Sequence, residues 1–135
     1  MNGKKIFCTI FLLACFSSLI FFAGSAKSQK KEQIKYKVIR LLSDEIIPSS
    51  ATISLGTVVI WVNESREMVK TQFSNINNSA SSCDGSTRFN TDSAKVISAE
   101  IPSAGFGSIC LIQKGEFNYI VKRGSHKLKG KIIVK

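Results

Sequence analysis

The stretch that decides the fold reads Gly-Glu-Phe-Asn-Tyr-Ile-Val at residues 115–121 and, a few residues later, His-Lys-Leu-Lys-Gly-Lys-Ile-Ile-Val at residues 126–134. Phe117, Tyr119 and Val121 occupy alternate positions of the first run, a period typical of a strand with one buried face. Ile132 and Val134 share one face of a second strand by the same rule. The sequence therefore predicts two strands joined by a loop.

The loop between these strands is expected to hold the only histidine of the chain, His126, and to end at Gly130. Arg123, Lys127 and Lys129 surround this histidine in the sequence. The ordinary interpretation of His126 is therefore a solvated histidine in a basic loop.

Shorter runs with the same period precede this stretch. Ile34, Tyr36 and Val38 predict a first strand with its lysines in water, and the apolar run at 57–62 predicts a strand buried on both faces. Further strands are expected at 51–55, 69–73, 95–101 and 108–112, with a long irregular connection at 74–94. Short strands separated by turn signals, without a helical period, predict an all-β, two-sheet Greek-key β-sandwich of about one hundred residues.

The first 26 residues have the features of a signal peptide. Lys4 and Lys5 precede an almost wholly apolar run at 6–22, and the small residues at 23–26 suit cleavage before Lys27. Cleavage would leave a flexible basic leader at 27–33 and a single domain at 34–135, and would place the protein in the periplasm or outside the cell. The alternatives are a retained membrane anchor and a lipidated Cys15.

The chain is strongly basic, with a formal net charge of +10. This favours anionic partners such as acidic proteins, lipid headgroups or cell-surface polyanions. Nucleic acid is not expected as a partner, because the sequence has no arginine-rich helix and no basic-aromatic stacking platform. Membrane contact is expected only through an uncleaved or lipidated N-terminus. Lys122, Arg123, Lys127 and Lys129 are the candidate binding surface.

Cys83 and Cys110 would be the cysteines of the exported chain. An even pair in an exported protein predicts a disulfide, which would restrict the unfolded chain by roughly 3–4 kcal/mol. The alternative is a pair of thiolates that bind a soft metal, although the pair lacks the short Cys-x-x-Cys spacing of most sulfur sites.

Four motifs follow one another along residues 34–135. They are Ile-Ile-Pro at 46–48, Gly-Thr-Val-Val-Ile-Trp-Val-Asn at 56–63, Gly-Glu-Phe-Asn-Tyr at 115–119 and Gly-Lys-Ile-Ile-Val at 130–134. Their order resembles the cupredoxin family, the plastocyanin-like copper proteins, and the resemblance implies that family's β-sandwich. An immunoglobulin-like sandwich fits less well, because Trp61 precedes both Cys83 and Cys110.

The resemblance also implies where copper ligands would lie. A type 1 copper site needs two imidazoles, a thiolate and usually a weak thioether. Family members place the first histidine shortly after the Trp-Val-Asn strand, but residues 64–69 contain none. The thiolate position is Val121, and Leu128 stands near the usual methionine. His126, at the position of the second histidine, is then the one ligand of four that survives.

Met68 and His126 are the candidate metal ligands that remain, as a soft site for reduced copper. The ordinary interpretation of Met68 is a residue that fills the core. Hydrolytic catalysis is not expected, since the lone histidine has no evident carboxylate partner and no Gly-x-Ser-x-Gly motif occurs.

We therefore expect a non-blue binding or structural protein of the cell envelope, with no enzyme activity and no cofactor. One alternative is a copper-binding electron-transfer or copper-handling protein, as the resemblance implies. Another is a soft-metal chaperone that uses Met68, Cys83, Cys110 and His126.

Overall fold

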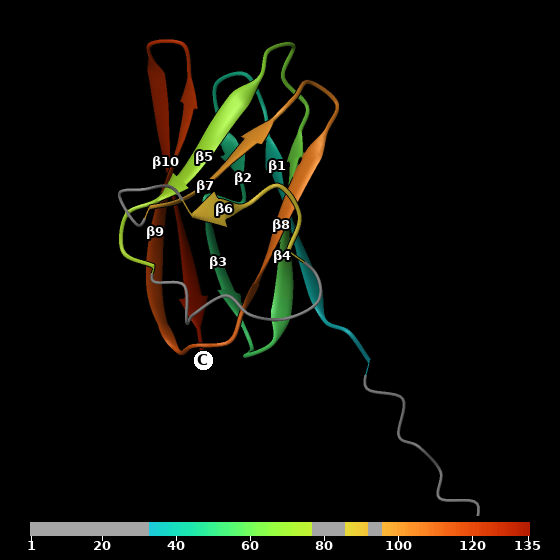
Figure 1. Cartoon of the computed structure of the whole chain (residues 1–135), viewed down its shortest axis with the longest axis vertical. Helices are drawn as coiled ribbons and strands as arrows, with labels where there is room; N and C mark the ends of the chain where they lie inside the picture. Colours follow the sequence, from blue (N-terminus) through green and yellow to red (C-terminus); the bar gives the residue numbers. More distant parts are fainter. Residues whose placement is uncertain (1–32, 77–85, 92–95) are drawn as a thin grey trace, which may run out of the picture. The chain divides into compact units, whose positions relative to one another are not determined.

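The computed structural model describes residues 33–76, 86–91 and 96–135. Gln33–Lys135 form one compact unit (Figure 1). The predicted signal peptide, nearly all of the predicted leader and Cys83 lie outside the described residues. Within the described ranges, no helix is long and apolar enough to cross a membrane.

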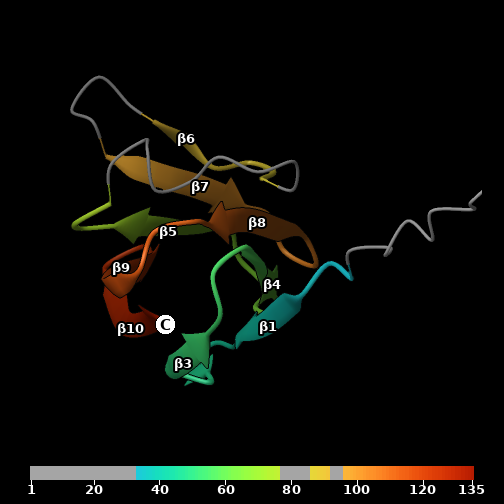
Figure 2. The same cartoon turned by 90° about the horizontal axis from the view of Figure 1, so that it is seen from below.

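Two sheets face each other, as the predicted all-β sandwich requires (Figures 1 and 2). The four-stranded sheet has the order β2 (Ile46–Ile47), β1 (Tyr36–Leu41), β4 (Thr57–Asn63) and β8 (Phe106–Leu111). The six-stranded sheet has the order β3 (Ser50–Ile53), β10 (His126–Val134), β9 (Gly115–Arg123), β5 (Val69–Phe73), β7 (Ile97–Ile101) and β6 (Asn90–Thr91). Both sheets are mixed, because β1 runs parallel to β4 and β3 runs parallel to β10.

An aromatic cluster fills the space between the sheets. Trp61 is fully buried, and its ring meets those of Phe73 and Tyr119 edge-on at centroid distances of 5.7 and 5.4 Å. Phe89 packs on the same tryptophan at 5.1 Å. Such edge-on pairs stabilise a core beyond the area they bury. The prediction that Trp61, Phe117 and Tyr119 belong to the core is confirmed.

The first strand buries the opposite face from the one that the sequence predicted. Ile39 and Leu41 are fully buried, whereas Tyr36 and Val38 are 70% and 40% exposed. The register with β4 sets Ile39 opposite Trp61, so the odd-numbered residues of β1 point into the sandwich. The early alternation of Ile34, Tyr36 and Val38 describes the outer face instead.

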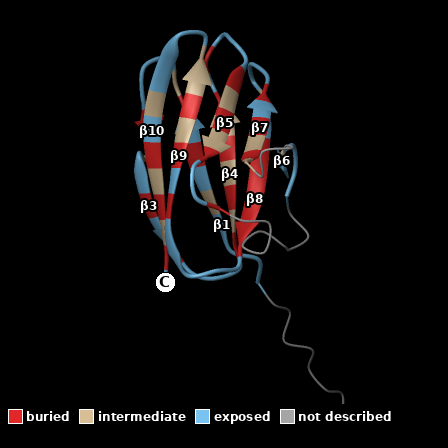
Figure 3. Ribbon diagram, turned by 60° about the vertical axis from the view of Figure 1, so that its left-hand side comes forward, coloured by how far each residue is buried: buried red, intermediate tan, exposed pale blue. Residues whose placement is uncertain are grey.

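The second correction concerns β4, which is not buried on both faces. Val59 and Trp61 are fully buried, but Val58, Ile60 and Val62 are only half-buried on the outer face of the four-stranded sheet. Figure 3 shows the alternation of buried and intermediate residues along this strand. A continuous apolar run alone does not distinguish a doubly covered strand from one with an apolar outer face.

Candidate functional site

Strands β9 and β10 are joined by a tight hairpin rather than by the predicted loop. Arg123 pairs directly with His126, which leaves only Gly124 and Ser125 between the strands. Gly124 has a φ of +53°, as the first central residue of a type II′ hairpin requires. His126 is therefore the first residue of β10 and not a loop residue, and Gly130 lies inside the strand rather than at its start.

A small cavity, partly open to solvent, lies at the hairpin end, where the resemblance places the copper ligands. Val121 and Leu128 are cross-strand partners, and both line this cavity together with His126. Val69, Leu42, Ser43 and Arg123 complete the lining. The cavity volume is about 10 Å³, at the lower limit for a single water molecule. The structure thus brings together three of the four positions that the resemblance assigns to copper ligands, but aliphatic side chains fill the space between them.

Arg123 adds a positive charge to this cavity. Its side chain is only 15% exposed, and its guanidinium lies 3.5 Å from the carboxylate of Asp44. The Asp44 side chain is 91% exposed, so solvent weakens this ion pair. The carboxylate therefore neutralises little of the charge on Arg123. A cation held at the cavity opposes the entry of a metal ion.

The residues around the cavity do not fit copper. Val121 and Leu128 have no donor atom, and the charged group that lines the cavity with His126 is the guanidinium of Arg123, which has no lone pair to offer a metal ion. Among the residues that the structure describes, no three His, Cys, Asp or Glu side chains form a group that could hold a metal ion. A single imidazole cannot supply the thiolate and second imidazole of a type 1 site.

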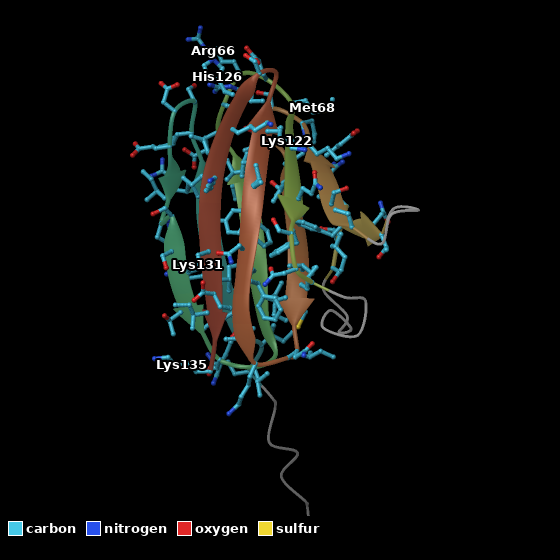
Figure 4. All side chains as sticks on the ribbon, turned by 90° about the vertical axis from the view of Figure 1, so that its left-hand side faces the viewer. Arg66, Met68, Lys122, His126, Lys131 and Lys135 are labelled. Atoms are coloured by element: carbon cyan, nitrogen blue, oxygen red, sulfur yellow. The ribbon has the colours of Figure 1, made fainter. Side chains whose placement is uncertain are left out.

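Met68 lies outside this cavity, in the segment between β4 and β5, and it does not belong to the core. Its side chain is 60% exposed, so the interpretation of Met68 as a residue that fills the core is wrong. Figure 4 shows Met68 and His126 at the same end of the sandwich. The structure therefore places both candidate metal ligands at one end but sets only His126 against the cavity.

Asn63 orders this end of the molecule, although it is not among the predicted site residues. Its fully buried amide donates to the carbonyl oxygens of Glu67 at 2.8 Å, Ile101 at 2.9 Å and Pro102 at 3.1 Å. Its Oδ1 accepts from the backbone N–H of Ser65 at 3.0 Å. The position of Asn63 at the end of an apolar strand could have indicated this role. An amide buried there needs hydrogen-bond partners for all its polar atoms.

A second candidate site is the outer face of the six-stranded sheet, which is rich in lysine. Lys122 lies directly opposite Lys127 on one side and Lys70 on the other, so three lysines form a row across β10, β9 and β5. The amine of Lys122 donates to Oε1 of Gln72 at 2.9 Å. This basic row contains two of the four residues predicted as a binding surface.

Lys129 is on the same face as the basic row, two residues along β10 from Lys127. Arg123 does not share this face, because it alternates with Lys122 along β9 and lines the inner cavity. Three of the four predicted surface residues are thus brought together, and the fourth points to the other side of the sheet.

Cys110 is fully buried in β8, opposite Val58 of β4. It alternates along the strand with the core residues Ile109 and Leu111 and so takes the opposite face of the sheet. Its predicted partner Cys83 is outside the described residues, so this pairing stays a prediction.

Comparison with solved structures identifies the fold. The chain superposes on an oxidised amicyanin mutant with a TM-score of 0.53 at 12% identity, covering 73% of this chain and 80% of that one. Amicyanin from Paracoccus versutus gives 0.52 at 15% identity, with 78% and 83% covered. No protein-family model and no curated protein matches the sequence. Amicyanin is a cupredoxin, so the chain has the cupredoxin fold, as the resemblance of its motifs implied.

Proposed function

We propose that the chain is an exported binding or structural protein that uses the cupredoxin fold without a type 1 copper centre and without enzyme activity. The observation that carries this proposal is the cross-strand pair Val121 and Leu128, which occupies two ligand positions with aliphatic side chains. A protein without a redox group at this site cannot use the fold for electron transfer. The basic N-terminal sequence with its apolar run and small residues supports export.

The likeness to amicyanin supports one alternative, a copper-binding electron-transfer or copper-handling protein of the periplasm. A fold supports many activities, so function has to be argued from the site. Among the described residues around the cavity, His126 alone has a side chain that commonly binds copper. The residues of the site therefore favour the non-blue role over the alternative.

The predicted Cys83–Cys110 disulfide is part of the proposal, because a bonded pair offers no thiolate to a metal. Thiol titration of the denatured exported protein, together with metal analysis of the native protein, tests both statements. We expect no free thiol and no bound copper, and two thiols after reduction as the positive control. Two free thiols with bound copper in the untreated protein would instead support the soft-metal site of Met68, Cys83, Cys110 and His126.

A further inference from the structure

We propose that the outer face of β5, β9 and β10 binds a linear anionic polysaccharide. This inference deepens the proposed binding role and rests on it. The basic row defined above, Lys70, Lys122 and Lys127, is the centre of the site, and Lys129 extends it along β10.

The arrangement of the basic row is unfavourable in the isolated protein. Neighbouring strands are about 4.8 Å apart, and like charges directly opposite each other on one face of a sheet are destabilising. Glu100 lies opposite Lys70 at one end of the row, but Lys122 faces a lysine on both sides. Within the described residues, no carboxylate forms an ion pair with Lys122, Lys127 or Lys129. An anionic ligand would relieve this repulsion.

The charges also extend along a strand. Lys127, Lys129 and Lys131 occupy alternate positions on the outer face of β10, at intervals of about 6.7 Å. Lys131 is already paired with Glu116 at 2.8 Å, so the uncompensated charge is concentrated toward the hairpin end. Figure 4 shows Lys122 near that end and Lys131 farther along the sheet. A chain of spaced anionic groups can follow β10 and meet the basic row.

The chemistry of this face distinguishes a polysaccharide from other anionic partners. Lysines act as point charges and do not require the planar, bidentate geometry that arginine provides. Lysine is depleted in protein–protein interfaces, and the apolar residues of the face, Ile120 and Ile133, are half-buried rather than available for insertion into a membrane. None of the described outward residues of β5, β9 and β10 is aromatic, so the face offers no platform for nucleic-acid bases.

Binding of dextran sulfate to the exported protein, measured by titration calorimetry at several salt concentrations, tests the inference. The double variant K122Q/K127Q is compared with K35Q/K114Q, which removes the same charge from exposed lysines outside this face. We expect K122Q/K127Q to weaken binding at low salt by at least about tenfold, and to lower the slope of log K against log salt by about one per lysine. The control variant should weaken binding less than threefold.

Equal losses in the two double variants would overturn the inference, because binding would then follow net charge alone. Equal binding of uncharged dextran, or binding to phosphatidylglycerol vesicles without binding to dextran sulfate, would also overturn it. If K122Q/K127Q does not fold, the single variant K127Q replaces it, with at least about a threefold loss expected. A blue copper protein with intact dextran sulfate binding would refute the proposed function but leave this site in place.

Discussion

The ring of Tyr119 lies directly across Gly130, its partner in the β9–β10 ladder. A Cβ atom at residue 130 would overlap the Cζ and hydroxyl oxygen of Tyr119. Glycine in the middle of a strand often marks such a close approach. The absence of a side chain at this position lets the tyrosine ring reach Trp61 and Phe73 in the core.

Substitution of Gly130 by alanine should therefore destabilise the fold. The added methyl group forces Tyr119 out of its position, and overpacking of this kind costs about 1–3 kcal/mol. Urea unfolding measures the change in the free energy of unfolding. Lys129→Ala on the exposed neighbour is the control, with an expected change within about 0.5 kcal/mol. Equal stability of Gly130→Ala and the native protein would contradict the packing of Tyr119 across Gly130.

Tyr119 should also make stability depend on pH in the alkaline range. Burial raises the pKa of Tyr119 to about 12, and the nearby Trp61 indole N–H offsets only part of this effect. The unfolded chain loses the phenolic proton near pH 10 and the native protein near pH 12, so stability falls between these values. The predicted loss is about 3 kcal/mol, since each pKa unit corresponds to about 1.4 kcal/mol.

Comparison of variants separates this effect from lysine titration, which occurs in the same pH range. Tyr119→Phe should remove the loss attributed to Tyr119 and leave stability at neutral pH unchanged or higher, because the buried hydroxyl forms no hydrogen bond with any residue that the structure describes. Tyr36→Phe, at a tyrosine that is 70% exposed, should keep the full alkaline loss. The same pH profile for Tyr119→Phe and the native protein would refute the assignment.

Asn63→Ala should destabilise the segment between β4 and β5. The substitution leaves the carbonyl oxygens of Glu67, Ile101 and Pro102 without the amide donor, and we expect a loss of about 2–4 kcal/mol. Thermal and urea unfolding measure it. Asn118→Ala removes an exposed amide from β9 and should change stability by less than about 0.5 kcal/mol. A similar small effect at Asn63 would show that its hydrogen bonds contribute little.

Much of the fold could be predicted from residue patterns. The alternation of Phe117, Tyr119 and Val121 gave the inner face of β9 correctly, because a period of two fixes which side chains share a face. The prediction of the inner face of β1 was wrong, because both faces of that strand carry apolar residues. Only its pairing with β4 decides that Ile39 and Leu41 point inward. Alternation cannot choose between two apolar faces.

The sequence predicted which copper ligands are missing from the candidate site, but not the structural features that stand in their place. The sequence showed Val121 and Leu128 where copper ligands would stand. The sequence could not show that only two residues, Gly124 and Ser125, connect β9 and β10. Strand pairing and the positive φ of Gly124 determine the length of this connection. The alignment of Lys70 with Lys122 likewise depends on register between two strands that are distant in sequence.

Visible absorption of the protein after incubation with Cu(II) and removal of excess metal tests the central claim most directly. The claim is that Val121, Leu128 and Arg123 have replaced a type 1 copper site. We predict no intense blue colour and less than stoichiometric copper, with any weakly bound copper lost in His126→Ala. An intense blue protein with one copper per chain would contradict the account, because that colour requires a copper–thiolate bond that Val121 cannot form.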